Sequence, residues 1–201
     1  MTASGTVEAA AAAARRGELI VFPTDTVYGI GTRPDDPVAT ARIFAAKRRP
    51  RDLTLPLLIA TSDAARRIAV FDERASRVAA ACWPGALTLV LARTAVSRGW
   101  ELGGDGATIG VRVPDHPVAR AVLERTGALA VTSANRSGGT PGRDRDELVA
   151  LFGDAVAAYV FDDRPLGEAA STVMDLTGRD PEILRRGDVD PDLAIASAAG
   201  R

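Results

Sequence analysis

Two residue types that are nearly absent from this chain point to its chemistry. Lys47 is the only lysine among 25 cationic residues, Asn135 is the only asparagine, and there is no glutamine. Arginine occupies nearly every other cationic position, so we expect a surviving lysine or asparagine where its chemistry is needed. Lys47 lies in Ala-Lys-Arg-Arg-Pro and Asn135 in Thr-Ser-Ala-Asn-Arg-Ser-Gly-Gly. These two segments are therefore the first candidates for a functional site.

The segment around Lys47 has the composition of a phosphate-binding element. A lysine ammonium is a compact point charge suited to phosphate oxygens, whereas an arginine presents a bidentate fork. Lys47 and Arg49 could therefore hold a polyphosphate from two directions. The alternative is that these cations only compensate the dipole at a helix end, a role that arginine would fill equally well. A Walker A motif is excluded, because no GxxxxGK[ST] sequence contains the single lysine.

Two loops carry donors for an anionic or hydroxylated ligand. Residues 133–141, Ser-Ala-Asn-Arg-Ser-Gly-Gly-Thr-Pro, offer hydroxyl and amide groups on a flexible backbone. Residues 23–31, Pro-Thr-Asp-Thr-Val-Tyr-Gly-Ile-Gly, combine small hydroxyl side chains with glycines that let a ligand approach the backbone. A solvated turn is the alternative for the first loop, and a strand-to-strand turn for the second. The Gly-x-Gly of the second loop is not a dinucleotide fingerprint, because the third glycine and the helix start are missing.

Arg112 is expected to point to the same side of a strand as Thr108 and Gly110, because side chains alternate along a strand. An arginine in this position fits a carboxylate or phosphate site. Exposure on a half-solvated sheet is the alternative. Ser171 and Arg185 lie at the ends of two other predicted strands, and the same two interpretations apply to them.

Composition is that of a soluble globular protein and excludes several kinds of site. The 201 residues, 46% hydrophobic and 25% charged, fit a single domain with a sizeable core. A net charge of −1 gives no global attraction to nucleic acid, and no apolar run is long enough to predict a membrane span. The single cysteine, Cys82, favours a reducing, cytoplasmic setting. His116 has no histidine or cysteine partner for zinc or nucleophilic chemistry, so we assign it to a helix N-terminus.

Hydrophobic periodicity and capping residues predict a mixed α/β chain without internal repeats. Helices are expected at 6–16, from Pro37 to Lys47 after an Asp36 cap, after caps at Ser62, Asp72 and Asp115, near 146–152 and near 191–198. Strands are expected at 18–22, 55–60, 86–91, 108–113, 128–132 and near 157–161, 171–176 and 182–185. This pattern predicts a twisted mixed sheet flanked by helices around a polar cleft, in one domain spanning 1–201.

Taken together, these segments resemble the YrdC/TsaC family, the L-threonylcarbamoyladenylate synthases. The family's paired K-x-R and S-x-N signature is present as Lys47/Arg49 and Ser133/Asn135. The resemblance covers nearly the whole chain and is to the short, single-domain form. The matching motifs are Phe22-Pro-Thr-Asp-Thr-Val-Tyr-Gly, Ile43-Phe-Ala-Ala-Lys-Arg-Arg-Pro, Trp83-Pro-Gly-Ala-Leu-Thr, Val111-Arg-Val-Pro-Asp-His-Pro, Ser133-Ala-Asn-Arg-Ser-Gly, Ser171-Thr-Val-Met-Asp-Leu and Ile183-Leu-Arg.

The resemblance implies a YrdC-like α/β fold, a twisted mixed sheet around a deep, positively charged cleft, and a cytoplasmic nucleotidyltransferase. The implied reaction converts L-threonine, bicarbonate or CO₂, and ATP with Mg²⁺ into threonylcarbamoyl-AMP and pyrophosphate. The product would feed the transferase machinery that makes N6-threonylcarbamoyladenosine in tRNA. Lys47 and Arg49 are the implied catalytic residues, and no metal ligand or general base can be named. The implied ATP contacts are Lys47, Arg49, Thr108, Ser133, Asn135, Thr140 and Arg185, and the implied threonine contacts are Thr26, Arg112 and Ser171.

The sequence departs from the family pattern on one side of the expected cleft. Five residues separate Pro50 from Pro56, where many relatives have three. Ala60 stands where several relatives have a histidine near threonine, and the match at Thr140 is offset by one residue. These departures affect the expected contacts with threonine and ATP near the predicted strand 55–60.

Two other functions fit parts of the sequence. A tRNA- or double-stranded-RNA-binding module without synthase activity could use a basic patch, although the near-neutral net charge disfavours broad nucleic-acid affinity. The residues of this predicted patch are Arg42, Lys47, Arg48, Arg49 and Arg51. Carbamoyl-adenylate chemistry on another acceptor, as in the YrdC-like domain of hydrogenase maturation proteins, is the other alternative. That domain normally accompanies acylphosphatase and zinc-finger modules, which are absent from this sequence.

Overall fold

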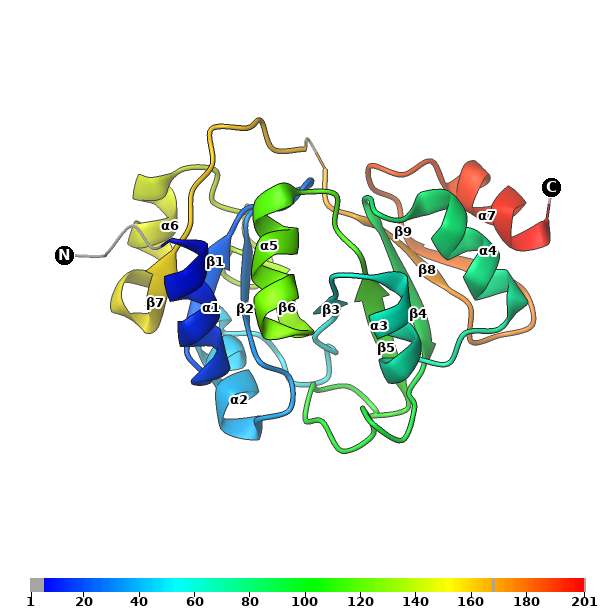
Figure 1. Cartoon of the computed structure of the whole chain (residues 1–201), viewed down its shortest axis with the longest axis horizontal. Coiled ribbons are helices and arrows are strands. Elements are labelled where there is room, and N and C mark those ends of the chain that lie inside the picture. Colours follow the sequence, from blue (N-terminus) through cyan, green and yellow to red (C-terminus); the bar gives the residue numbers. More distant parts are fainter. Residues whose placement is uncertain (1–5, 168, 201) are drawn as a thin grey trace.

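A computed structural model describes residues 6–167 and 169–200 of the chain and shows a single mixed sheet. The strands are β1 (Leu19–Phe22), β2 (Gly29–Thr32), β3 (Leu57–Leu58), β4 (Leu87–Ala92), β5 (Thr108–Arg112), β6 (Leu129–Ser133), β7 (Val156–Tyr159), β8 (Thr172–Asp175) and β9 (Glu182–Arg185). They are ordered β7-β1-β2-β6-β3-β5-β4-β8-β9 (Figure 1). The β1–β7, β3–β5 and β4–β8 pairs are parallel and the other pairs are antiparallel. The predicted mixed sheet is therefore confirmed.

The helices begin at side-chain caps for the most part. They are α1 (Val7–Arg15), α2 (Pro37–Lys47), α3 (Ser62–Ile68), α4 (Glu73–Cys82), α5 (Pro117–Thr126), α6 (Arg145–Phe152) and α7 (Pro191–Ala199), with a 3-10 turn, η1 (Gly153–Ala155). Asp36 and Asp72 accept hydrogen bonds from first-turn amides of α2 and α4, as predicted. Among the described residues, no helix is long and apolar enough to cross a membrane.

Two predicted caps were wrong by one residue. The cap of α3 is Thr61, whose hydroxyl accepts from Ala64 N, and Ser62 is already helical. The cap position of α5 is His116 rather than Asp115, and its side chain makes no capping hydrogen bond. Pro117 follows directly, and its fixed φ favours the start of a helix without a side-chain cap.

The strand predictions failed in two places. The predicted strand 55–60 is paired as a regular strand only at Leu57–Leu58, and Leu55 N and Ile59 N donate instead to Leu102 O and Arg112 O. Strand β2 was not predicted, because its sequence, Gly-Ile-Gly-Thr, has the low strand propensity of glycine. Tertiary packing explains the presence of this strand. β2 pairs with β6, and the space beside β6 leaves no room for a side chain at Gly29 or Gly31.

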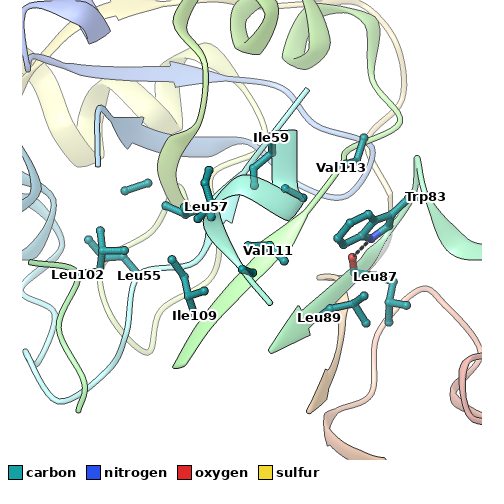
Figure 2. Close-up of a cluster of buried hydrophobic side chains, with 14 of the residues drawn as sticks. Leu55, Leu57, Ile59, Trp83, Leu87, Leu89, Leu102, Ile109, Val111 and Val113 are labelled. Atoms are coloured by element: carbon teal, nitrogen blue, oxygen red, sulfur yellow. Dashed lines mark hydrogen bonds between the residues drawn. The ribbon is translucent and has the colours of Figure 1, made fainter. Parts of the chain in front are cut away.

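The core lies on both faces of the sheet. Leu19 and Val21 of β1 belong to the larger cluster, whereas Ile20 belongs to a second cluster beneath α1 and α5, so the strand is buried on both sides. Helices α1 and α5 lie side by side over β1, β2 and β6 (Figure 1). The larger cluster continues through β3, β4 and β5, where the Trp83 indole donates to Leu87 O at 2.7 Å (Figure 2).

Replacing Gly31 by alanine is predicted to destabilise the fold. A Cβ at this position would lie 2.7 Å from Ala130 O and 2.7 Å from the Val131 side chain, so β2 and β6 would have to move apart. Overpacking of this kind costs about 1–3 kcal/mol. Chemical denaturation of the wild type and Gly31→Ala measures the loss. Gly99→Ala is the control, because no atom lies within 4 Å of its added Cβ; equal losses in both variants would contradict the packing argument.

Candidate active site

One face of the sheet carries a cavity of about 460 Å³, a size typical of small-molecule sites. Thr108, Gly110 and Arg112 of β5 line it together, as the strand alternation predicts. The side chains of Thr88 and Val90 on the neighbouring strand β4 also line it. The other polar lining residues are Thr24, Thr26, Arg49, Thr54, Thr132, Ser133, Ser171, Asp175 and Arg185.

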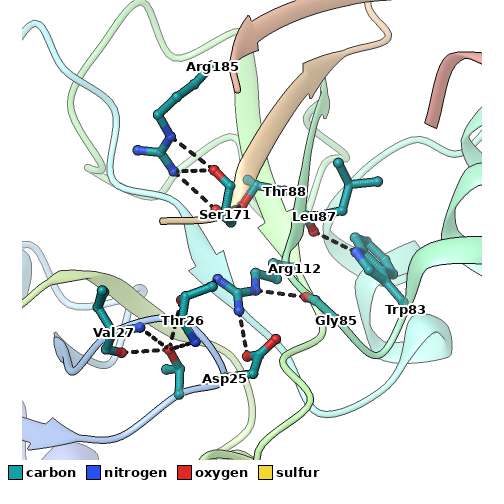
Figure 3. Close-up of polar contacts among 11 residues, drawn as sticks. Asp25, Thr26, Val27, Trp83, Gly85, Leu87, Thr88, Arg112, Ser171 and Arg185 are labelled. Atoms are coloured by element: carbon teal, nitrogen blue, oxygen red, sulfur yellow. Dashed lines mark hydrogen bonds and ion pairs between the residues drawn. The ribbon is translucent and has the colours of Figure 1, made fainter. Parts of the chain in front are cut away.

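Arg112 is the most constrained polar group of this cavity. It is only 5% exposed, so the alternative of an arginine on a solvated face is wrong. Its Nε donates to Gly85 O at 2.9 Å, Nη1 to Thr26 Oγ1 at 3.0 Å and Nη2 to Asp25 Oδ1 at 2.5 Å (Figure 3). A guanidinium has five N–H donors, so one donor on each Nη atom has no acceptor among the described residues. Two such donors match a carboxylate, which binds arginine in a bidentate manner.

Asp25 stabilises the charged form of Arg112 and holds its guanidinium in place. Burial lowers the pKa of Arg112, and the carboxylate of Asp25 opposes this shift. The Asp25 side chain is itself only 15% exposed. The role of Asp25 could not be predicted from its place in the Thr-Asp-Thr segment, because this segment comes to lie beside β5 only in the folded chain.

Ser171 forms a second polar group beside Arg112. Its Oγ lies 2.9 Å from Thr88 Oγ1, and Arg185 Nη2 donates to Ser171 Oγ at 3.1 Å and to Ser171 O at 2.8 Å (Figure 3). The predicted threonine contacts Thr26, Arg112 and Ser171 are thus brought together at one cavity. Thr88 was not singled out from the sequence, because a threonine in an apolar strand is explained equally well by strand propensity.

The predicted ATP contacts divide into two groups. Arg49, Thr108, Ser133 and Arg185 line the cavity, whereas Lys47, Asn135 and Thr140 are not among its lining residues. Thr140 is exposed. Burial lowers the pKa of both Arg49 and Arg185, although an arginine keeps its charge at neutral pH. The assignment of all seven residues to ATP stays a prediction.

Lys47 lies beneath the Ser-Ala-Asn loop and is only 1% exposed. Its Nζ donates to Ser133 O at 2.5 Å, Asn135 O at 2.6 Å and Asn135 Oδ1 at 3.2 Å. An ammonium has three donors, and these three acceptors use all of them. In this arrangement Lys47 holds the loop that presents Ser133 to the cavity.

Asn135 completes the same loop. Its Oδ1 accepts from Ser133 Oγ at 2.6 Å, and its Nδ2 donates to Arg136 O at 2.7 Å and Gly139 O at 2.6 Å. The loop therefore uses one carbonyl acceptor and two N–H donors on a single side-chain group, a combination that among the standard side chains only asparagine and glutamine offer. The two rare residues noticed in the sequence are direct hydrogen-bond partners.

The predicted basic patch is not one continuous surface. Lys47 is buried, and Arg49 is half-buried and donates to Leu53 O and Thr54 O. Arg42 donates to Gly17 O, on the side of α1. Arg48 and Arg51 are exposed. The patch proposed for RNA binding thus loses the lysine that it included.

The described residues contain no cluster of three or more histidine, cysteine, aspartate or glutamate side chains that could hold a metal by themselves. Among the described cavity-lining residues, Asp175 is the only carboxylate. His116 lies at the N-terminus of α5, as predicted, and burial lowers its pKa. Neither of its ring nitrogens has a hydrogen-bond partner in the described part of the chain, and His116 is not among the cavity-lining residues.

Lys47 is predicted to titrate far below an ordinary lysine. Burial, together with the charges of Arg49 and Arg136, lowers its pKa from 10.5 to about 7, while its three oxygen acceptors favour the charged form and oppose the shift. Because the chain has one lysine, lysine-selective ¹³C labelling gives one NMR signal for the titration. A midpoint near 10.5 in the folded protein would contradict the prediction.

This shift also has a consequence for stability. Between pH 7 and 10.5 the unfolded chain holds a proton on Lys47 that the folded chain has lost. The contribution of this group to the free energy of unfolding therefore rises with pH across that window. Lys47→Met should remove this contribution, which denaturation at a series of pH values measures.

Comparisons with known proteins agree with this geometry. The Sua5/YciO/YrdC family, described as "Telomere recombination", matches residues 12–187. A Mycobacterium tuberculosis protein, named provisionally as a threonylcarbamoyl-AMP synthase, is 38% identical over 96% of this chain and 89% of its own length. The Bacillus subtilis threonylcarbamoyl-AMP synthase is 35% identical over 90% of this chain but only 53% of its own length.

A solved structure of a relative shows the same fold. The crystal structure of Pyrococcus abyssi Sua5 complexed with L-threonine has a TM-score of 0.85 and 32% identity, covering 96% of this chain and 57% of that one. The family match covers most of the chain, and several relatives exceed 30% identity. The chain therefore belongs to the Sua5/YciO/YrdC family.

Proposed function

We propose that this protein is an L-threonylcarbamoyl-AMP synthase. The observation that carries the proposal is the buried guanidinium of Arg112. It lines the cavity, has two donors without an acceptor among the described residues, and fits the carboxylate of an amino acid. The names of the Mycobacterium and Bacillus relatives support the same activity, and so does the threonine in the Pyrococcus complex.

Threonine would bind at the Arg112 end of the cavity. Its carboxylate would receive the two free Nη donors, and Thr26 and Ser171 would contact the rest of the amino acid. Asp25 is a positioning residue, because it contacts Arg112 and is not among the cavity-lining residues. It holds the guanidinium in the plane in which two parallel hydrogen bonds can form.

ATP would occupy the remainder of the cavity. Arg49 and Arg185 are cationic groups suited to phosphate oxygens, and Thr108 and Ser133 offer hydroxyl groups. Lys47 and Asn135 would contribute by holding the Ser133 loop in place.

Mg²⁺ would enter with the nucleotide. Magnesium is usually held by one or two carboxylates together with phosphates and waters. Asp175 is the only acidic residue in the described part of the lining, and these residues fit an ion carried mainly by the ATP phosphates. When bound, the ion would neutralise charge on the phosphates.

The reaction would proceed in two steps. The threonine nitrogen attacks the carbon of CO₂ and loses a proton, which gives the carbamate. A carbamate oxygen then bonds to the α-phosphorus, the bond from this phosphorus to the bridging oxygen breaks, and pyrophosphate leaves. The protein would act by holding the two substrates together and by neutralising charge with Arg49 and Arg185.

The mixed anhydride formed in this way is a reactive acyl donor. We propose that a cytoplasmic tRNA threonylcarbamoyl-transferase machinery consumes it to modify adenosine in tRNA. Direct tRNA binding by this chain is not required for the synthesis itself.

The purified protein is expected to release pyrophosphate only when ATP, Mg²⁺, bicarbonate and L-threonine are all present. Labelled threonine should appear in an adenylate separated by chromatography. Omission of each substrate in turn is the control. If labelled threonine never enters an adenylate while the protein remains folded, the proposed function is wrong.

Arg112→Lys is predicted to raise the KM for threonine about 100-fold, with a much smaller effect on the KM for ATP. A lysine ammonium cannot form the bidentate pair, and its three donors are too few for Gly85, Thr26 and Asp25 together with a carboxylate. Steady-state kinetics with each substrate varied in turn measures the two constants. Arg98→Lys, at an exposed position outside the cavity lining, is the matched control. Equal effects on both constants would argue against a threonine carboxylate at Arg112.

A further inference from the structure

Thr88 lies at the proposed amino-acid end of the cavity. In the antiparallel β4–β5 pair, Leu89 is opposite Val111 and Val90 is opposite Gly110. Thr88 precedes Leu89 in β4 as Arg112 follows Val111 in β5, and both residues line the cavity. The Thr88 methyl group lies 3.2 Å from the position of a Cβ on Gly110, which shares a face of β5 with Arg112. A molecule whose carboxylate meets Arg112 therefore has its adjoining carbon atoms close to Thr88.

The Thr88 side chain is fixed in orientation. Its methyl group lies 3.2 Å from the position that a Cβ on Gly110 would occupy, and its hydroxyl lies 2.9 Å from Ser171 Oγ. The methyl group thus faces β5 and the hydroxyl faces β8. A serine at this position would keep the hydroxyl but would lack the methyl group that fixes it.

The Thr88–Ser171 hydroxyl pair has one hydrogen-bond donor to spare. Arg185 Nη2 donates to Ser171 Oγ, and one hydroxyl proton is shared between Ser171 and Thr88. Whichever hydroxyl donates within the pair, the proton of the other is left without a described acceptor. Both residues line the cavity, so the pair can donate to and accept from a ligand hydroxyl.

A purely structural role is the alternative for Thr88. Thr172, on the adjoining strand β8, shows what that role looks like, because its buried hydroxyl donates to the backbone at Val189 O. The described partner of Thr88 is a cavity hydroxyl rather than a backbone carbonyl. Fold stability alone therefore does not account for the hydroxyl of Thr88.

We propose that Thr88 is a specificity-determining residue, which together with Ser171 recognises the β-hydroxyl of the amino-acid substrate. This inference rests on the proposed function, and it concerns how threonine is distinguished from valine, in which a methyl group replaces the hydroxyl. A site that hydrogen-bonds a substrate hydroxyl strongly rejects an analogue that lacks it, because its own polar groups are then left unpaired.

The test uses the variants Thr88→Val and Thr88→Ser, with L-threonine and L-valine as competing substrates. Thr88→Val keeps the shape of the side chain and removes its hydroxyl, so it should lower the ratio of kcat/KM for threonine to that for valine about 100-fold. Thr88→Ser should keep this ratio within about tenfold of the wild type, and the KM for ATP should change little in either variant. Thr126→Val, on α5 and outside the cavity lining, is the control and should leave the ratio unchanged.

The outcomes separate this inference from the proposed function. If the wild type neither binds threonine in calorimetry nor converts it to an adenylate, the proposed function itself is wrong, and Thr88 cannot have this role. If the wild type uses threonine and Thr88→Val keeps the wild-type preference over valine, only the role of Thr88 is overturned. A uniform loss of activity with both amino acids in Thr88→Val and Thr88→Ser would also overturn it, because it would indicate a structural role.

Discussion

The structure of the cavity depends on the burial of one cation, the guanidinium of Arg112. Removing a charge from water costs on the order of several kcal/mol unless an opposite charge and hydrogen bonds compensate it. Asp25, Thr26 and Gly85 supply this compensation from two segments that are distant in sequence. The hydrogen bonds of the Arg112 guanidinium therefore hold the Thr-Asp-Thr loop and the segment before β4 against β5.

This arrangement explains why the two free donors of Arg112 are useful for binding. A guanidinium in solvent can rotate, and its donors are already bonded to water. In the cavity, three of its five donors are fixed by the protein, so the remaining two have a defined direction. A carboxylate that binds there meets a site that needs little reorganisation, which favours both affinity and positioning.

The Ser-Ala-Asn loop follows a related principle on the other side of the cavity. The ammonium of Lys47 is surrounded by oxygen atoms of Ser133 and Asn135, and the Asn135 amide bonds to the backbone at both ends of the turn. An arginine is larger and planar, and an aspartate in place of Asn135 could not donate. The geometry of a buried network therefore explains why this arginine-rich chain has a lysine and an asparagine at these two positions.

Most of the helices, the mixed α/β class and the segments that line the cavity can be predicted from the sequence, because caps, periodicity and rare residues are local signals. It correctly placed Thr108, Gly110 and Arg112 on one face, since alternation along a strand needs no tertiary information. Three features emerge only in the folded chain: Gly29–Thr32 is a strand, Lys47 is buried, and Asp25 and Thr88 lie beside Arg112. These features depend on which strands are neighbours in the sheet, and strand order is set by long-range packing that no local pattern records.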